Sequence, residues 1–197
     1  MKMNKYQKNV IVSEERIQQE VKKLAAKLNE KYKGKSIVAL GLLKGAFVFM
    51  ADIIRQLNID VQVEFLIVKS YKNCQTSGKP KILLDLKRGI SNQNIVIFED
   101  IIDTGRTIAA VKDYLSYKGA KQVEVVALLT KPSRREVFVD VDYELFTIPN
   151  EIVVGYGLDY NEYGRHLPDI IALNDAALEE LKEWILQYAA PLKRLFI

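Results

Sequence analysis

The sequence predicts an α/β fold with a mostly parallel, twisted sheet and helices on both of its faces. Two observations support this prediction. Short apolar runs, of the kind that form buried strands, alternate with amphipathic helical segments between residues 36 and 129. Strand, helix and strand in succession imply right-handed crossovers, which make neighbouring strands parallel. The 197 residues fit one domain, for which we expect a core over about 35–150 and a small hood from about 1–30 and 152–197.

The chain opens with an amphipathic helix predicted over residues 14–32. Ser13 is a suitable N-cap, and apolar residues recur on one helical face at Ile17, Val21, Leu24 and Leu28. Gly34 marks the end of this helix. The elements expected next are a buried strand over 36–42, a helix over 46–57 and an alternating strand over 61–67 that ends near Ser70.

The second half of the chain continues the alternation after a polar segment. Residues 71–80 contain Ser77, Gly78 and Pro80, so we expect a long loop there. The elements expected after it are a returning strand over 82–86, a strand over 94–98 that stops at Glu99, a helix over 107–118 closed by Gly119, a strand over 123–129, short β segments as far as Val154 and a last helix over 175–188.

Composition excludes several classes of site and partner. The one cysteine, Cys74, rules out an intrachain disulfide, and the one histidine, His166, leaves too few soft ligands for structural zinc. The formal net charge of +4 suits an anionic small molecule and falls short of a nucleic-acid signature. No apolar run is long enough to cross a bilayer, so we expect a soluble, cytoplasmic protein that binds neither nucleic acid nor membrane. We expect any catalysis to use carboxylates, lysines and hard metal ions.

The candidate site follows from the predicted sheet. Open parallel sheets bind ligands at the carboxyl ends of their strands. The segments that follow predicted strands are Leu43-Lys44-Gly45, the stretch from Glu99 to Thr107, and Thr130-Lys131. We therefore expect these three segments to meet at one edge.

The stretch from Glu99 to Thr107 combines acids with an anion site. Glu99 and Asp100 could accept hydrogen bonds from vicinal sugar hydroxyls or hold Mg²⁺, an ion that prefers oxygen ligands. Gly105 permits a close backbone approach, and the free amides of the helix that follows suit a phosphate. The hydroxyls of Thr104 and Thr107 add donors, and Asp103 could take a proton. Alternatively, the acids only stabilise the helix N-terminus, where negative charge is favoured.

This stretch, Glu99-Asp100-Ile101-Ile102-Asp103-Thr104-Gly105-Arg106-Thr107, resembles the phosphoribosyl-diphosphate motif of the type I phosphoribosyltransferases, and more narrowly that of the hypoxanthine-guanine phosphoribosyltransferases. Further motifs follow the order of that family and cover most of the chain. They are Leu43-Lys44-Gly45, Lys69-Ser70-Tyr71, Lys131-Pro132-Ser133-Arg134-Arg135 and Val153-Val154-Gly155-Tyr156-Gly157-Leu158-Asp159-Tyr160.

The resemblance implies the type I phosphoribosyltransferase fold and a role for each part of the acidic stretch. Glu99 and Asp100 would meet the ribose hydroxyls and, with Asp159, the Mg²⁺ ions. The 5′-phosphate would be wrapped by Asp103, Thr104, Gly105, Arg106 and Thr107. Asp103 would also be the catalytic acid-base group at the purine N7.

The resemblance also implies the remaining contacts. Diphosphate would be bound by Lys44 and Gly45, in a loop that the family often builds around a non-proline cis peptide, and by Arg165. The purine would be bound by Lys131, which donates to its O6, and by Glu151, Ile152, Val153 and Asp159. Ser70 and Tyr71 would close over the reaction, because a glycosyl cation-like transition state must be shielded from water.

The implied activity is purine salvage: transfer of a phosphoribosyl group from phosphoribosyl diphosphate to hypoxanthine or guanine, giving IMP or GMP, by a cytoplasmic homodimer or homotetramer. Many relatives stack an aromatic ring on the purine where this sequence has Ile152, which either covers the base or is simply core. Two alternatives stay open. The acceptor could be xanthine, a pyrimidine or another base, or the chain could be a non-catalytic RNA-binding regulator of the same fold.

Overall fold

Two sheets organise the chain in the computed structural model, which describes residues 9–69, 81–87, 89–184 and 186. Within these residues the larger sheet has the strand order β4-β3-β2-β5-β6-β7 and the smaller one β1-β9-β8. The elements in chain order are β1 (Val10–Val12), α1 (Glu14–Lys31), β2 (Ser36–Leu43), α2 (Phe47–Ile54), β3 (Asp60–Lys69), β4 (Lys81–Leu84), β5 (Asn94–Ile102), α3 (Arg106–Tyr117), β6 (Gln122–Thr130), a 3₁₀ turn (Pro132–Arg134), β7 (Tyr143–Thr147), β8 (Ile152–Val154), β9 (Ile170–Leu173) and α4 (Asp175–Trp184).

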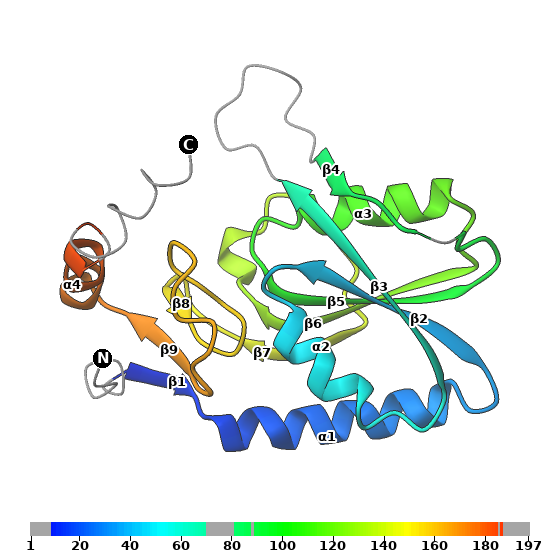
Figure 1. The fold of residues 1–197 in the computed structure, drawn as a ribbon, viewed down its shortest axis with the longest axis horizontal. Helices are drawn as coiled ribbons and strands as arrows, with labels where there is room; N and C mark the ends of the chain where they lie inside the picture. Colours follow the sequence, from blue (N-terminus) through cyan, green and yellow to red (C-terminus); the bar gives the residue numbers. More distant parts are fainter. Residues whose placement is uncertain (1–8, 70–80, 88, 185, 187–197) are drawn as a thin grey trace.

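The large sheet is mostly parallel, as the sequence predicts. Strand β2 runs parallel to β3 and β5, and β5, β6 and β7 continue in the same direction. Only the described edge strand β4 is antiparallel to its neighbour, β3. Helices α1 and α2 cover one face and α3 covers the other (Figure 1). This confirms the predicted fold class.

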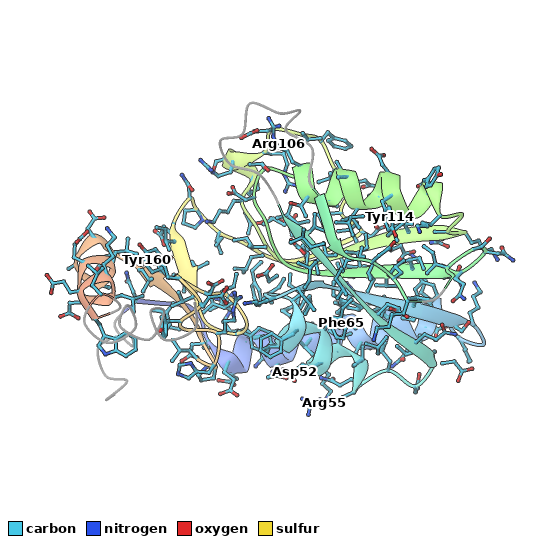
Figure 2. All side chains as sticks on the ribbon, turned by 45° about the horizontal axis from the view of Figure 1, so that its top comes forward. Asp52, Arg55, Phe65, Arg106, Tyr114 and Tyr160 are labelled. Atoms are coloured by element: carbon cyan, nitrogen blue, oxygen red, sulfur yellow. The ribbon has the colours of Figure 1, made fainter. Side chains whose placement is uncertain are left out.

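Two apolar layers hold the helices on the sheet. On the α1 and α2 side, Phe49 of α2 packs edge-on against Phe98 of β5, with ring centroids 6.0 Å apart. On the other side, Ile108, Val111 and Leu115 of α3 are buried against the strands. Figure 2 shows the labelled side chains Arg106 and Tyr114 with α3, and Asp52 and Arg55 with α2, on opposite sides of the sheet.

The small sheet brings β1 together with β8 and β9, which come late in the sequence. β9 pairs antiparallel with both β1 and β8, so residues about 160 positions apart become neighbours. Helix α4 packs beside it through Leu181. Helix α1, by contrast, packs against α2 and the large sheet. The division into a core and a hood therefore stays a prediction, because both β1 and the first residue of α1 contact the 152–197 segment: the Glu14 N–H donates to Asp169 Oδ1 at 2.8 Å (Figure 1).

Several element bounds differ from the sequence predictions. β5 does not stop at Glu99 but continues to Ile102, because Ile101 and Ile102 stay paired with β6. Helix α2 ends at Ile54 instead of residue 57. The backbone N–H groups that follow bond to the carbonyl three residues earlier instead of four, as from Gln56 to Ile53, which is the pattern of a 3₁₀ turn. β4 ends at Leu84 rather than at residue 86. Strands β1 and β9 were missed because they are too short for a periodic pattern.

Other predictions lie partly or wholly outside the described residues. They are the loop over 71–80, which includes Cys74, and the end of the last helix. Across the described part of the chain, no helix has both the length and the apolar character that crossing a membrane requires.

Candidate active site

The carboxyl ends of three parallel strands meet at one edge of the large sheet. Lys44 follows β2, Asp103 follows β5 and Lys131 follows β6. Because β2, β5 and β6 are adjacent in the sheet, the three segments predicted from the sequence are neighbours. This edge is therefore the candidate active site.

Two carboxylates lie near the end of β5: Glu99 is buried and Asp100 is partly buried. Glu99 and Asp100 are successive residues of a regular strand, so their side chains point to opposite faces of the sheet. Burial raises the pKa of Glu99 well above its ordinary range, and the neighbouring Asp100 raises it further. Glu99 Oε2 has no hydrogen-bond partner among the described residues. An unpartnered buried oxygen is costly, so this atom is available to a hydroxyl or a metal-bound water.

Asp100 lies where several loops converge. Burial raises the pKa of Asp100 to about 6, although the N–H of Ile101, 2.9 Å from Oδ1, and the positive charge of Arg165 oppose the rise. The negative charge of Asp159 adds to it. Asp159 and Arg165, far away in sequence, are therefore electrostatic neighbours of the β5 carboxylates.

The loop from Asp103 to Thr107 has the backbone of an anion site. Gly105 adopts a φ of +85°, and a Cβ there would lie 2.5 Å from the carbonyl oxygen of Val137. Only glycine therefore fits this position. Gly105 is also the N-cap of α3 and gives it no side-chain cap. The first amide of this twelve-residue helix, that of Arg106, donates to Thr104 Oγ1 at 3.4 Å, and the amides that follow it are left to bind a ligand.

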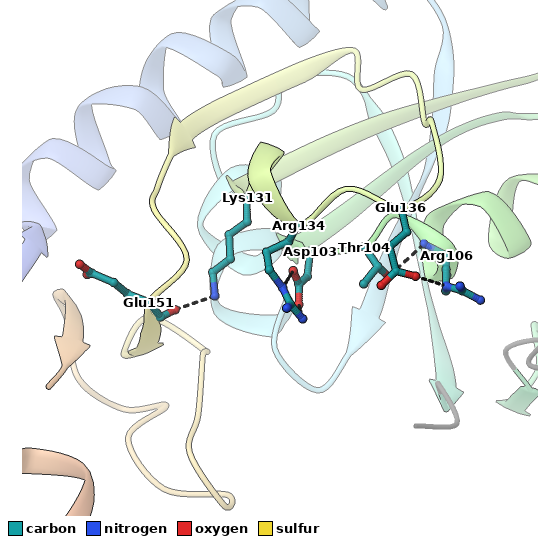
Figure 3. Close-up of polar contacts among 7 residues, drawn as sticks. All are labelled: Asp103, Thr104, Arg106, Lys131, Arg134, Glu136 and Glu151. Carbon is teal, nitrogen blue, oxygen red and sulfur yellow. Dashed lines mark hydrogen bonds and ion pairs between the residues drawn. The ribbon is translucent and has the colours of Figure 1, made fainter. Parts of the chain in front are cut away.

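A neighbouring segment clasps this loop. The backbone N–H groups of Glu136 and Val137 both donate to the carbonyl of Thr104, at 3.0 Å each. The guanidinium of Arg134 donates to Asp103 from Nε at 3.0 Å and from a terminal nitrogen at 3.5 Å. Arg106 Nε pairs with Glu136 Oε2 at 2.7 Å. Figure 3 shows Arg134 beside Asp103 and Glu136 beside Arg106. We call residues 134–137 the clasp segment.

The predicted base-binding residues come from two adjoining elements. Lys131 is buried at the end of β6, and its Nζ donates to the backbone carbonyl of Glu151 at 2.6 Å (Figure 3). On β8, Ile152 is 45% exposed whereas Val153 is 7% exposed. Ile152 is therefore not part of the core, and an exposed aliphatic side chain stands next to the Lys131 contact.

The loops that carry Lys44 and Asp159 are in direct backbone contact. A Cβ on Gly45 would lie 1.4 Å from Asp100 Oδ2, and one on Gly157 would lie 2.1 Å from the carbonyl oxygen of Gly45. The peptide bond between Leu43 and Lys44 is cis, as the resemblance implies. Two glycines thus bring the end of β5, the loop after β2 and the loop after β8 together.

Four charged residues form an ion-pair cluster beside these glycines. Lys44 Nζ lies 3.1 Å from Glu162 Oε1, and a terminal nitrogen of Arg165 lies 3.1 Å from Glu162 Oε2. The same nitrogen lies 2.8 Å from Asp159 Oδ1. Hydrogen bonds from Lys44 and then Arg165 lower the pKa of Glu162. Asp159, which was also predicted to bind the purine, lies in this cluster. None of its described contacts is to Lys131, Glu151, Ile152 or Val153.

Sequence reasoning missed three participants: Arg134, Glu136 and Glu162. Arg134 stands within the quoted motif that begins at Lys131, so its proximity to Asp103 was within reach. Glu136 and Glu162 carry no pattern of their own. Of the predicted residues, Ser70 and Tyr71 lie outside the described part of the chain.

The carboxylates suit a metal only in combination with a ligand. Within the described residues, no three Asp, Glu, His or Cys side chains are grouped so that they could hold an ion alone. Mg²⁺ commonly binds through one or two carboxylates together with substrate phosphates and water. The buried, unpartnered Glu99 oxygen and the nearby Asp100 and Asp159 fit that mode.

The chain is similar to known proteins over most of its length. Residues 9–161 match the phosphoribosyl transferase domain family. A hypoxanthine-guanine phosphoribosyltransferase of Streptococcus mutans is 40% identical over 169 residues, which are 85% of this chain and 94% of that protein. A bifunctional protein of Listeria innocua, TilS/HprT, is 42% identical over 162 residues, and the chain spans only 25% of its length.

Solved structures give the same result. The crystal structure of a hypoxanthine-guanine phosphoribosyltransferase from Bacillus anthracis has a TM-score of 0.81 and 40% identity, with 85% of this chain and 99% of that chain covered. The family match over residues 9–161 includes the sheet edge and the loop after β8 as far as Asn161, and it ends before Glu162 and Arg165. The chain therefore belongs to the phosphoribosyltransferase family, among the hypoxanthine-guanine phosphoribosyltransferases.

Proposed function

We propose that the protein transfers the 5-phosphoribosyl group of phosphoribosyl diphosphate to hypoxanthine or guanine, giving IMP or GMP and diphosphate. One observation carries the proposal: the N-terminus of α3, the Glu99 and Asp100 carboxylates and two cations, Lys44 and Arg165, meet at a single sheet edge. These groups suit the phosphate, the ribose and the diphosphate of the donor, in that order. The relatives with this name support the choice of acceptor.

In the proposed reaction, a purine ring nitrogen forms a bond to ribose C1 while the bond from C1 to the diphosphate oxygen breaks. The electron pair of that bond leaves with the diphosphate, towards Lys44 and Arg165. The purine proton passes from N7 to Asp103. The guanidinium of Arg134 donates to both oxygens of the Asp103 carboxylate. These bonds fix the orientation of Asp103, the group that is proposed to accept the proton.

Glu99 and Asp100 are proposed to accept from the ribose hydroxyls, and a fully buried carboxylate strengthens such bonds because its surroundings are poorly polarisable. Glu99, Asp100 and Asp159, together with oxygens of the donor, would hold Mg²⁺, which would supply charge stabilisation for the departing diphosphate. Lys44, Arg165 and the α3 amides supply the rest from the chain itself.

The acceptor is proposed to lie between the Lys131 ammonium and β8. Lys131 donates to the purine O6, and its bond to the Glu151 carbonyl keeps the buried ammonium in place. The backbone of Val153 meets the opposite ring edge. The exposed side chain of Ile152 covers one face of the base without an aromatic stacking term.

A turnover assay tests the proposal. The protein is incubated with phosphoribosyl diphosphate and Mg²⁺ and offered hypoxanthine, guanine, xanthine, adenine and orotate in turn, while nucleotide and diphosphate are measured. We expect turnover with hypoxanthine and guanine. Faster turnover with xanthine or orotate would show that this base, and not hypoxanthine or guanine, is the preferred acceptor. Salt-sensitive RNA binding without turnover would indicate a regulator.

We also propose a cytoplasmic protein that assembles into a homodimer or homotetramer. Exposed apolar side chains on α2, β3 and β4, namely Phe47, Val63 and Leu84, support an interface between copies of the chain. Sedimentation equilibrium checks it: Val63→Lys should shift the mass towards the monomer, whereas a monomeric parent protein would remove the proposal.

A further inference from the structure

Glu162 spans the two cations that are proposed to bind diphosphate. One of its carboxylate oxygens lies 3.1 Å from Lys44 Nζ, and the other lies 3.1 Å from Arg165. In the ligand-free protein, the Glu162 carboxylate thus lies between Lys44 and Arg165, the two cations that are proposed to bind phosphoribosyl diphosphate. No role for Glu162 was expected from the sequence.

The local backbone aims Glu162 at these cations. Residues 160–163 form a tight turn in which Tyr160 and Tyr163 exchange backbone hydrogen bonds of 2.9 and 3.0 Å. Asn161 and Glu162, at its centre, have φ values of +50° and +72°, an uncommon conformation for a side chain as large as that of Glu. The Glu162 N–H also donates to Asp159 Oδ2 at 2.7 Å. The turn is therefore held in place independently of its ion pairs.

The remaining contacts of Arg165 keep the cation in position when Glu162 leaves. A terminal nitrogen of Arg165 donates to the Gly157 carbonyl at 2.8 Å, and another pairs with Asp159. The Arg165 Nε is buried and has no hydrogen-bond partner among the described residues. The arginine thus has two anchors besides Glu162 and one donor still unused.

We propose that Glu162 occupies the diphosphate subsite in the ligand-free protein and is displaced when diphosphate or the donor binds. This inference rests on the proposed function, because it takes the Lys44 and Arg165 pair as the diphosphate site. Carboxylate and phosphate oxygens make the same charge-assisted hydrogen bonds to these cations, so they compete. The displaced carboxylate returns after each turnover and favours release of the product diphosphate.

The exposure of the pair makes the competitor weak enough to be displaced. Side chains of Lys44 and Glu162 are 63% and 61% exposed, and exposed ion pairs are only slightly stabilising. Because Arg165 is 18% exposed, its pair with Glu162 is less screened. Removing both pairs should therefore tighten diphosphate binding by about threefold to tenfold.

The experiment compares Glu162→Gln with Glu162→Asp, by titrating inorganic diphosphate into each protein with Mg²⁺ present, in a calorimeter. Glu162→Gln keeps the size of the side chain and removes its charge. Glu162→Asp keeps the charge but is one methylene shorter, so it cannot reach both cations. We expect about threefold to tenfold tighter binding for Glu162→Gln and at least about twofold for Glu162→Asp. Glu179→Gln, which breaks a matched exposed pair with Lys182 on α4, should bind like the parent.

The outcomes separate the inference from the proposed function. Unchanged or weaker binding in Glu162→Gln overturns the inference, as does tightening in Glu162→Gln with none in Glu162→Asp, which indicates only long-range repulsion. Suppose that the parent protein lacks turnover with every base, and that Glu162→Gln and Glu162→Asp both bind diphosphate more tightly. This result refutes the proposed function and supports the inference. In an active parent, the KM for phosphoribosyl diphosphate should fall in Glu162→Gln together with the dissociation constant.

Discussion

The two halves of the candidate donor site are built in different ways. The phosphate half is one stretch of chain, Asp103 to Thr107, whose ligand donors are backbone amides at the start of α3. The diphosphate half is assembled from three separated segments around Gly45, Gly157 and Asp100, and its ligand donors are the side chains Lys44 and Arg165. Both halves hold ion pairs in the ligand-free protein.

The difference determines what each half tolerates. Backbone amides cannot be neutralised by a nearby carboxylate, so the phosphate half needs only its loop conformation. Side-chain cations are neutralised by any acid within reach, so the diphosphate half depends on which partner its cations have. The phosphate half should therefore be sensitive to backbone changes, and the diphosphate half to both packing and charge.

The largest effect is expected from Asp103→Asn. The amide cannot accept the purine proton, so kcat should fall by about 10²-fold to 10⁴-fold, which corresponds to roughly 3 to 5 kcal/mol. Affinity for phosphoribosyl diphosphate should change little, because the α3 amides are untouched. Steady-state kinetics and a donor titration check both parts.

The control for this variant is Asp113→Asn, on an exposed position of the same helix, which should keep full turnover. Full turnover in Asp103→Asn would show that another group takes the proton. A loss of donor binding equal to the loss of rate would show that the phosphate half does use its side chains.

The next effect concerns the packing of the diphosphate half. In Gly157→Ala the new methyl group would lie 2.1 Å from the Gly45 carbonyl, at a φ of +100°. We expect a loss of about 2 to 4 kcal/mol in the free energy of unfolding. The KM for phosphoribosyl diphosphate should rise at least about tenfold, because Lys44 and Arg165 move apart. Urea unfolding and kinetics measure these two quantities.

Gly34→Ala is the matched control, since Gly34 also has a positive φ, +71°, but has open space around it. It should lose about 1 to 2 kcal/mol of stability and keep its kinetics. Equal kinetic defects in the two variants would mean that backbone strain, rather than the contact between the two loops, accounts for the effect.

A third prediction tests what anchors the assembled half. The hydroxyl of Tyr156, next to Gly157, donates to Asp52 Oδ2 on α2 at 2.7 Å, and Gln18 Nε2 donates to the same atom at 2.8 Å. Burial alone would raise the pKa of Asp52, but the hydrogen bonds from Tyr156, Gln18 and Arg55 outweigh it and hold the pKa below its usual value. Asp52 therefore links α1, α2 and the loop after β8.

Tyr156→Phe should lower the free energy of unfolding by about 1 to 2 kcal/mol at pH 7. Because the pKa of folded Asp52 is depressed, its contribution is present above the unfolded pKa, near 3.8, and is lost as the pH falls through the lower folded value. The difference between the two proteins should accordingly shrink below about pH 4. Urea unfolding at several pH values measures it, and a difference independent of pH would exclude the Asp52 bond as the cause.

The same contrast explains which parts of the site were predictable. Asp103 to Thr107 is contiguous, so its glycine, hydroxyls and helix start could be recognised together without knowledge of the fold. Several contacts of the diphosphate half join residues more than 100 positions apart, such as Tyr156 and Asp52 or Gly157 and Gly45. No local pattern encodes them. The position after a predicted strand pointed to Lys44, and only the resemblance to a known family suggested Arg165.

The errors in the predicted elements have a related cause. β5 was expected to end at Glu99 because the apolar pattern stops there, yet its backbone remains paired with β6 as far as Ile102. Hydrogen bonding between strands does not require apolar side chains, so the pattern reports burial rather than strand length. The buried Glu99 is therefore a strand residue, and its raised pKa follows from that position.

The smallest effect is expected from Glu136→Gln, which tests the clasp segment. It removes the partner of Arg106 from an ion pair whose side chains are 54% and 49% exposed. The two backbone hydrogen bonds to the Thr104 carbonyl remain. The KM for phosphoribosyl diphosphate should change by less than about threefold, because the proposed phosphate ligands are amides that this substitution does not touch. The same exchange of Glu for Gln should thus matter at Glu162 and not at Glu136. A larger response at Glu136, measured by the same donor titration, would mean that the Arg106 side chain binds phosphate and that both halves of the site depend on the partners of their cations.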